Sequence, residues 1–311
     1  MKPPPFRYEC PSSLEEALAL RQEHGDEARP LAGGQSLVPM LNMRLARPTV
    51  LVDLNRLPAL DGIAAGNGHL EIGTLTRQRR LERSGAAEPI GALQDALPLV
   101  GHVATRNRGT VGGSVAHADP AAELPLALLA VGGSVVAESA ARGRREIPSD
   151  AFFTGFLTTA LEPDELAVAI RFRHPLPGET SALAEMAPRH GDFALALAAC
   201  WLRIVDGRIA AARVAVGAVA DRPLLLRRAA EALVGQEPSP DAARAAGAAA
   251  AGSVDPTGSL HAPPAYQRHL VEILVTRAVA RATARAQEVV AIDPLPGGQA
   301  RPPHDRDGIL P

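Results

Sequence analysis

The chain has 311 residues, enough for one large domain or two ordinary ones. Its 46% hydrophobic and 21% charged residues are typical of a globular protein, while a formal net charge of −2 and 3% aromatic residues argue against nucleic-acid partners. No uncharged apolar run approaches about 20 residues and the N-terminus lacks the apolar core of a signal peptide, so we expect a cytoplasmic protein without a membrane span.

The first part of the chain predicts two helices and two strands. Residues 12–25 form a helix in which Ser12 and Glu15 make a capping box and Gly25 ends the helix. A short strand then enters the run AGGQS at residues 32–36, and a helix follows with Pro39 in its first turn. The run TVLVDLN predicts a strand at residues 49–55.

The middle of the chain continues with mixed strands and helices up to a short segment that is rich in proline and glycine. Strands are predicted at residues 69–76, 133–139 and 165–172, and helices from near Thr76, at 90–102 and at 121–132. A second Gly-Gly run, GTVGGS at residues 109–114, lies among them. Residues 173–180 contain two prolines and a glycine, so we place a domain boundary there.

The last third predicts a hairpin followed by helices. Two apolar runs surround Asp206-Gly207, a dipeptide suited to a type I′ turn. Helices are expected at residues 223–235, near Asp241, and from Pro264 to about Glu288. Residues 289–311 are rich in proline and glycine and read as a tail that is flexible or ordered only against a partner.

The two Gly-Gly runs share one chemical possibility. Glycine lets the backbone bend tightly and approach a ligand, so successive N–H groups near a helix N-terminus can cradle phosphate. A Gly-Gly pair alone is more often a simple turn. Neither run matches the nicotinamide fingerprint G-x-G-x-x-G or the phosphate loop G-x-x-x-x-G-K-[ST], which argues against those two nucleotide sites.

Longer segments around these runs resemble the FAD-binding medium subunit of molybdenum hydroxylases, the flavoprotein family of carbon monoxide and xanthine dehydrogenases. The resemblance is carried by AGGQSLVPMLNMRLARPTVLVDLNRLPAL, ATRNRGTVGGSVAHADPAAELPLALLA, APRHGDFALALAA and AYQRHLVEILVTRAV. It implies an α+β fold: a two-subdomain FAD-binding domain of the vanillyl-alcohol-oxidase type and a smaller α/β C-terminal domain. The implied ranges are 1–175, with subdomains of about 1–57 and 58–175, then 176–288 and the tail 289–311.

The resemblance also implies a site in which both runs grip one non-covalent FAD near its pyrophosphate. The implied contacts are Ala32, Gly33, Gly34, Gln35, Ser36, Thr110, Gly112, Gly113, Ser114, Glu123, Leu161, Asp192 and Phe193.

Several of these contacts carry alternatives. Glu123 would bond the sugar hydroxyls of the ribityl region, or act as a first-turn carboxylate on the helix dipole. Leu161 would meet the flavin through its backbone, or belong to the core. Asp192 and Phe193 would approach the isoalloxazine ring, and relatives often have tyrosine at the position of Phe193. Pro188 stands where the family leads us to expect arginine.

The implied function is electron transfer within a larger complex. A small subunit would hold [2Fe–2S] clusters, a large subunit would hold the molybdenum–pterin centre, and this chain would pass electrons through FAD to NAD, a quinone or oxygen. A dimer of heterotrimers is implied, with no catalytic residue or metal ligand here. The two cysteines, Cys10 and Cys200, are too few for a cluster. A stand-alone FAD-dependent oxidoreductase and a flavin-free interaction protein remain alternatives.

Overall fold

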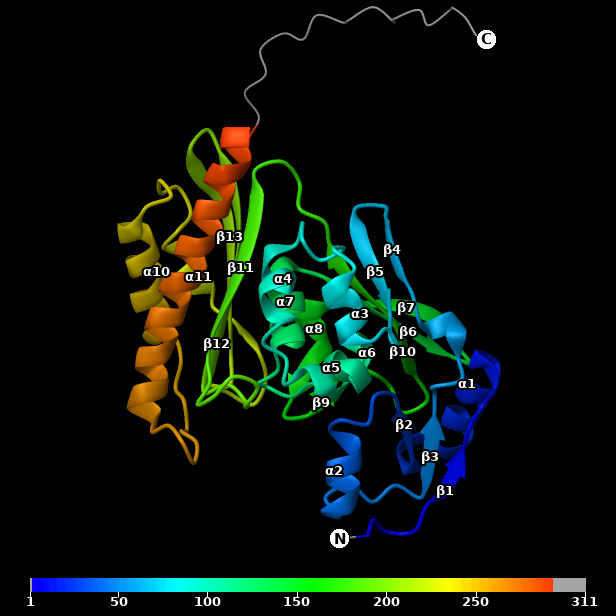
Figure 1. Ribbon diagram of the computed structural model, residues 1–311. Coiled ribbons are helices and arrows are strands. Elements are labelled where there is room, and N and C mark those ends of the chain that lie inside the picture. The colour runs from blue at the N-terminus through cyan, green and yellow to red at the C-terminus, as the bar shows by residue number, and fades with distance from the viewer. Residues whose placement is uncertain (1, 293–311) are drawn as a thin grey trace, which may run out of the picture.

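Three main sheets and a small two-stranded pair, with helices between them, build the molecule, as the computed structural model shows for residues 2–292 (Figure 1). A small parallel sheet lies at the N-terminal end, an antiparallel sheet with most of the helices lies in the centre, and a second antiparallel sheet carries the C-terminal helices. Within residues 2–292, none of the helices combines the length and the apolar character needed to span a membrane.

The N-terminal sheet has the order β1-β3-β2, with all strands parallel. Its elements are β1 (Arg7–Glu9), α1 (Leu14–His24), η1 (Gly25–Glu27), β2 (Ala28–Leu31), α2 (Leu37–Asn42) and β3 (Val50–Asp53). Parallel strands need crossover connections, and α1 and α2 provide them. Buried residues of α1 and β3 pack with Val136, Leu166 and Val168, so this layer is fixed to the central sheet.

The N-terminus of α1 corrects one sequence prediction. The capping side chain is Ser13, whose hydroxyl accepts a hydrogen bond from the Glu16 amide at 3.2 Å, and the Glu16 carboxylate accepts one from the Ser12 amide at 2.7 Å. The predicted pair of Ser12 and Glu15 is therefore wrong by one residue, because Ser12 and Ser13 both suit a cap and only the geometry of the entering chain selects between them. Gly25, with φ of +48°, ends the helix as predicted.

The central sheet has the order β4-β5-β10-β6-β7 and is antiparallel throughout. Its strands are β4 (Ile63–Gly66), β5 (His69–Gly73), β6 (Ser134–Ser139), β7 (Gly143–Pro148) and β10 (Leu166–Arg173), beside the small pair β8 (Phe153–Gly155) and β9 (Thr158–Thr159). The helices here are η2 (Pro58–Leu60), α3 (Gln78–Arg83), α4 (Gly91–Ala96), α5 (Val103–Arg108), α6 (Val111–His117), α7 (Glu123–Val131) and α8 (Ser149–Phe152). Every residue of α7 is buried, because the helix lies between the central and C-terminal sheets.

The C-terminal sheet has the order β11-β12-β13-β14. Its elements are β11 (Glu179–Met186), β12 (Ala196–Val205), β13 (Arg208–Gly217), β14 (Leu224–Leu225), α9 (Arg227–Glu231), α10 (Pro240–Ala251) and α11 (Pro264–Ile292). Asp206 and Gly207 both have positive φ, +50° and +74°, which confirms the predicted hairpin turn.

Two helix boundaries in this part differ from the sequence prediction. The helix expected at 223–235 begins only at Arg227, because Leu224 and Leu225 pair with β13 as an edge strand. Helix α11 continues to Ile292, so residues 289–292 of the expected tail are helical. The remainder of the expected tail lies outside the described residues.

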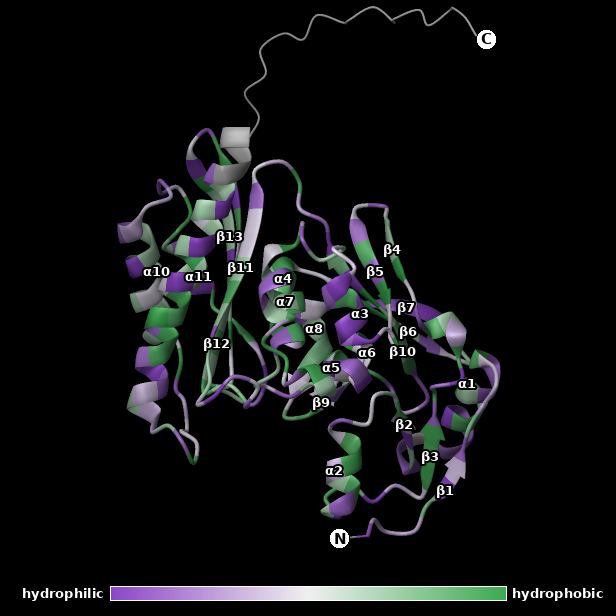
Figure 2. Ribbon diagram, viewed as in Figure 1, coloured by the Kyte–Doolittle hydropathy of each residue, from purple (hydrophilic) through white to green (hydrophobic). Residues whose placement is uncertain are grey.

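The C-terminal sheet is covered on both faces, which explains the unusually apolar start of β12. Ala198, Cys200 and Leu202 pack toward α10 and α11, whereas Leu197 and Ala199 pack toward α4 and α7. A strand buried on both faces loses its polar alternation. Figure 2 accordingly shows hydrophobic colouring along β12 and hydrophilic colouring on the outer helix α3.

Polar contacts fasten α4 to the C-terminal sheet and to α11. The Asp95 carboxylate accepts hydrogen bonds from Arg285 at 2.6 and 2.9 Å and from the Leu183 amide at 3.0 Å. The Ser181 hydroxyl accepts one from the Ala92 amide at 3.0 Å. This junction joins residues that are about 90 and 190 positions apart in the chain.

Candidate functional site

The fold brings the two Gly-Gly runs into direct contact. A Cβ added to Gly33 would lie 2.5 Å from the Arg108 carbonyl oxygen and 2.8 Å from the Gly109 Cα. A Cβ added to Gly113 would lie 3.5 Å from the Ala32 Cβ. The first run therefore lies against the residues that lead into the second, and Gly33 is needed because no side chain fits between the two backbones.

The first run, residues 32–36, offers a row of backbone donors between β2 and α2. Within residues 2–292, the N–H groups of Gly33, Gly34, Gln35 and Ser36 have no protein acceptor. Gly34 has φ of +72°, a left-handed conformation that lets the loop turn its donors outward. Gln35 and Ser36 are exposed, so an anion can reach these donors.

The second run is the first turn of a helix, and this changes what it can contribute. Thr110 is the N-cap of α6, and its buried hydroxyl accepts a hydrogen bond from the Gly113 amide at 3.0 Å. The Gly112 amide donates to the Thr74 carbonyl at 3.0 Å and the Ser114 amide to the Thr110 carbonyl at 3.1 Å. Of the residues expected to donate from this run, Gly112, Gly113 and Ser114 therefore have amides that are already bonded, whereas the Thr110 N–H group has no acceptor among residues 2–292.

Besides the Thr110 N–H group, the second run offers close packing and the Ser114 hydroxyl. Gly112 is buried, and a Cβ on it would lie 1.7 Å from the Thr74 hydroxyl oxygen, so glycine is required for the helix to approach that segment. Ser114 is half-buried, and its hydroxyl has no protein partner within the described part of the chain. Ser114 is thus the side chain of this run that can bond a ligand.

Two residues outside both runs connect them. Asn55, just after β3, donates from its side-chain amide to the Ala32 carbonyl at 2.9 Å. Arg77, just before α3, donates to the Asn55 side-chain oxygen at 2.7 Å and to the Arg108 carbonyl oxygen. Neither residue belongs to a local motif, although Asn55 lies two residues after the buried strand β3 ends, where polar residues often serve a site.

The electrostatics around these runs favour an anion. Burial and the nearby charge of Arg108 lower the pKa of Arg77, which nevertheless remains a cation at neutral pH. Among the residues that the structure describes, neither Arg77 nor Arg108 forms an ion pair with a carboxylate, in contrast to Arg79, Arg80 and Arg106 nearby. Two arginines without a carboxylate ion-pair partner therefore flank the contact between the two runs, although Asp53 and Asp61 lie near enough to favour the charged form of Arg77.

Glu123 and Leu161 lie deeper, against the central core. Glu123 is the first residue of α7 and is 7% exposed; burial, with a smaller contribution from the charge of Asp119, raises its pKa to about 7. Its position matches the first-turn alternative, but its partial protonation also lets it donate to a ligand hydroxyl. Leu161 is half-buried against the central core and its amide donates to the Thr159 hydroxyl at 3.3 Å, which favours the core interpretation.

Asp192 and Phe193 lie in an exposed loop after β11. Phe193 is 75% exposed, and Pro188 and Asp192 are exposed too. Gly191, with φ of +86°, packs so closely on His102 that a Cβ would lie 2.6 Å from the imidazole. The loop is therefore held beside the N-terminus of α5, which leads into the second Gly-Gly run.

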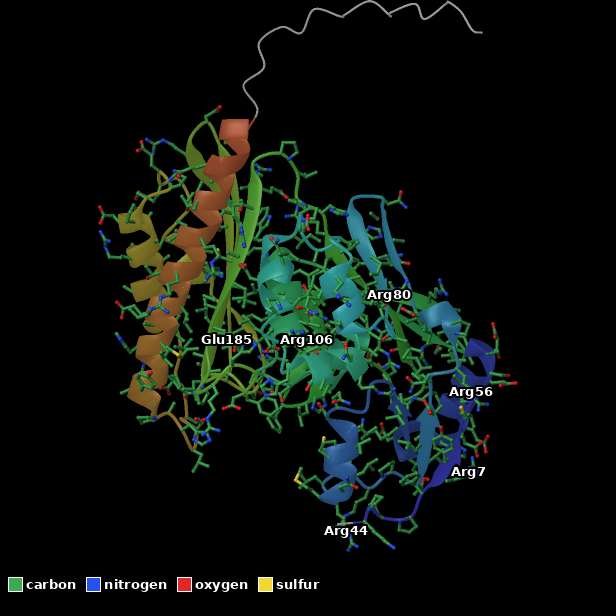
Figure 3. The ribbon with its side chains drawn as sticks, in the orientation of Figure 1. Arg7, Arg44, Arg56, Arg80, Arg106 and Glu185 are labelled. Carbon is green, nitrogen blue, oxygen red and sulfur yellow. The ribbon has the colours of Figure 1, made fainter. Side chains whose placement is uncertain are left out.

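Glu185 is a half-buried acid that the sequence interpretation missed. It follows Leu183 on the face of β11 that points toward α4 and α7, and one carboxylate oxygen is buried without a partner within residues 2–292. Burial, together with the charge of Glu123, raises its pKa to about 8. Figure 3 shows Glu185 on the side of the C-terminal sheet and Arg106 on the side of the central helices. A single glutamate among the apolar residues Ala182, Leu183, Ala184 and Met186 is the signal that could have found it.

No metal centre is seen in the part of the chain that is described: no three His, Cys, Asp or Glu side chains there converge. Cys10 is half-buried and Cys200 is fully buried, and both are free thiols.

Comparison with protein families matches nearly the whole chain. Residues 4–175 match the family described as the FAD binding domain in molybdopterin dehydrogenase. Residues 181–282 match the CO dehydrogenase flavoprotein C-terminal domain.

Individual relatives and solved structures agree with this match. The alpha subunit of the 6-hydroxypseudooxynicotine dehydrogenase complex of Paenarthrobacter nicotinovorans is 37% identical, over 92% of this chain and 97% of the relative. The structure of carbon monoxide dehydrogenase from Hydrogenophaga pseudoflava that lacks the Mo-pyranopterin moiety superimposes with a TM-score of 0.87 at 36% identity, covering 92% of this chain and 99% of that one. Quinoline 2-oxidoreductase from Pseudomonas putida 86 gives a TM-score of 0.86 at 35% identity, with the same coverages.

Proposed function

This chain belongs to the family of FAD-binding subunits of molybdopterin dehydrogenases, and on that premise we propose that it holds one FAD non-covalently and passes electrons from a partner's iron–sulfur clusters to an external acceptor. The observation that carries the proposal is the row of free N–H donors at residues 33–36, set against the second Gly-Gly run. FAD supplies the redox chemistry when bound, because it exchanges electrons singly or in pairs.

The residues present fit a dinucleotide pyrophosphate on this side of the site. Gly33, Gly34, Gln35 and Ser36 offer neutral donors, and Arg77 and Arg108 add positive charge. The second run contributes differently from the first: Gly112 and Gly113 let α6 pack closely, and Ser114 offers its hydroxyl. Thr110 holds the helix N-terminus in place.

Glu123, Asp192 and Phe193 would serve the rest of the cofactor. A carboxyl group with a pKa of about 7 can donate or accept a hydrogen bond near neutral pH, as a sugar hydroxyl requires. Phe193 offers an exposed ring without a hydroxyl, which suits stacking and excludes proton donation. Leu161 would contribute through its carbonyl, since its amide is already bonded.

The proposal extends to domains and partners. We place the FAD-binding domain at residues 1–175 and the C-terminal domain at 176–288, close to the two family matches. The iron–sulfur and molybdopterin subunits would be separate chains in a dimer of heterotrimers, supported by relatives that are named as subunits of complexes. The free thiols of Cys10 and Cys200 suit the cytoplasm.

The replacement of Ser36 by aspartate tests the cradle. In Ser36→Asp the new carboxylate would stand beside the pyrophosphate, and like charges repel, so we expect FAD affinity to fall by about tenfold or more, or about 1.4 kcal/mol. The measurement is a titration of the purified full chain with FAD, followed by flavin fluorescence and by the absorption bands that remain after desalting.

Ser36→Asn is the matched control, because asparagine has the size of aspartate, caps a helix equally well and carries no charge. Ser36 is exposed, so neither variant disturbs packing, whereas any side chain at Gly33 would collide with Arg108. Equal FAD affinity in Ser36→Asp and Ser36→Asn would contradict the cradle. A wild-type chain that binds no FAD, alone or with its partners, would favour the interaction-protein alternative.

A further inference from the structure

We propose that Arg77 and Asn55 are positioning residues that hold the first Gly-Gly run against the second, so that the free donors of residues 33–36 stay aimed at a diphosphate. The inference rests on the proposed function for the identity of the anion. The pair itself is defined by contacts between segments that are 22 to 31 residues apart.

The main chain around Arg77 pairs with the backbone of the second run. Arg77 pairs with Thr110 in an isolated antiparallel bridge. On either side of it, the Val111 amide donates to the Thr76 carbonyl at 2.9 Å and the Gln78 amide to the Gly109 carbonyl at 3.0 Å. Arg77 therefore cannot move without the backbone that leads into α6.

The side chain of Arg77 reaches toward the first run. Its guanidinium donates to the Asn55 side-chain oxygen at 2.7 Å, and Asn55 in turn donates to the Ala32 carbonyl at 2.9 Å. Its other terminal nitrogen donates to the Arg108 carbonyl oxygen, which is the atom that Gly33 packs against. A planar guanidinium with several fixed donors can bridge both acceptors at once.

Asn55 is itself fixed by the strand that precedes it. The Asp53 carboxylate accepts hydrogen bonds from the Asn55 main-chain amide at 2.9 Å and from its side-chain amide at 2.5 Å, while its other oxygen accepts one from the Tyr8 hydroxyl at 2.5 Å. These bonds orient the Asn55 side-chain oxygen toward Arg77. The connection thus runs from the parallel N-terminal sheet, through Asn55 and Arg77, to the helical side of the site.

The contacts answer a specific need of the first run. Its glycines allow close approach but also allow many backbone conformations, and donors that must be ordered on binding cost affinity. Asn55 donates to the Ala32 carbonyl, and Arg77 donates to the Arg108 carbonyl against which Gly33 packs. Neither contact occupies the N–H groups of residues 33–36. Arg77 also has no carboxylate partner among the described residues, so its positive charge remains available to an anion.

The test compares Arg77→Met, Arg77→Lys, Asn55→Leu and the double variant Arg77→Met/Asn55→Leu in the full chain. We expect each of the three single variants to weaken FAD binding by about tenfold, a coupling of about 1.4 kcal/mol, and the double variant to be little weaker than either Arg77→Met or Asn55→Leu because the two residues act as one unit. Arg77→Lys separates bridging from charge, since lysine keeps the charge but not the planar fork.

Arg80→Met is the matched control: Arg80 is an exposed arginine on α3, the helix that Arg77 precedes, and it pairs with Asp61 on the surface (Figure 3). A second readout needs no flavin. Amide hydrogen exchange in the peptide covering residues 28–42 should accelerate in Arg77→Met and remain unchanged in Arg80→Met.

The outcomes are distinguishable. Full FAD affinity in Arg77→Lys would overturn the bridging role, and unchanged exchange of residues 28–42 in Arg77→Met would overturn the inference altogether. If the wild-type chain binds no FAD while exchange responds as expected, the proposed function fails and the contact between the two runs stands as a structural feature. Thermal unfolding of each flavin-free variant verifies that it remains folded at the temperature of the titration.

Discussion

Asp95→Ala is expected to lower the free energy of unfolding by about 3 kcal/mol, because it leaves a half-buried arginine without its carboxylate partner and a buried amide without its acceptor. Asp95 bonds both terminal nitrogens of Arg285 and the Leu183 amide, and its side chain is only 12% exposed. The loss falls at the junction between the central helices and the C-terminal sheet.

Urea unfolding followed by the fluorescence of Trp201 measures this effect. Trp201 is the single tryptophan, lies on β12 and stacks under the Arg173 guanidinium at 4.6 Å, so it reports on the same junction. Asp95→Asn keeps an acceptor for Leu183 but loses the charge, and we expect about half the loss. An Asp95→Ala chain as stable as wild type would show that apolar packing of α4 and α7 alone holds the junction.

Glu185→Gln is expected to stabilise the protein by about 2 kcal/mol above pH 8 and to have little effect near pH 4.5. Its folded-state pKa of about 8 lies above its ordinary value of 4.5, so the folded state binds more protons than the unfolded state between these values. Stability is therefore lost as the pH rises from 4.5 to 8 while the burial penalty develops. The full shift would correspond to more than 2 kcal/mol, which we reduce because the side chain is partly exposed.

Stability curves between pH 5 and pH 9 for Glu185→Gln and wild type check this sign. Glu231→Gln serves as the control, because Glu231 is exposed on α9 and its removal should change stability by about 0.5 kcal/mol or less at every pH. Parallel curves for Glu185→Gln and wild type would mean that Glu185 finds a partner or water in solution. Glu123→Gln should move the Glu185 transition to lower pH, since the Glu123 charge contributes to the raised pKa.

The sequence predicted local features well where a few neighbouring residues decide the outcome. The Asp206-Gly207 turn requires two positive φ angles, which this dipeptide adopts readily, and the structure has it. Gly25 ends α1 for the same kind of reason. Where two neighbours were equally suitable, as Ser12 and Ser13 are, the prediction was wrong by one residue.

The sequence predicted the two glycine runs of the candidate site together with Glu123, Leu161, Asp192 and Phe193, but not the contacts that join the runs. Sequence reasoning treated both runs as donor loops, but Gly112, Gly113 and Ser114 donate to acceptors that tertiary contacts or the helix itself provide. The roles of the site residues in holding FAD stay a prediction. Asn55 and Arg77 had no local motif, because each acquires its contacts from segments distant in the chain, and the charge of Glu123 that acts on Glu185 likewise comes from a distant segment.

By itself the sequence determined the order of most elements, the hairpin, the glycine runs and, through its resemblance, the flavoprotein family, because these depend on short patterns of backbone preference and apolar spacing. Folding sets which N–H groups remain free, which arginines lack a carboxylate partner and which glutamates are shielded from solvent. Those properties depend on what lies opposite each group after folding, and hydrogen bonding and burial are set by that neighbour rather than by the residue's own place in the chain.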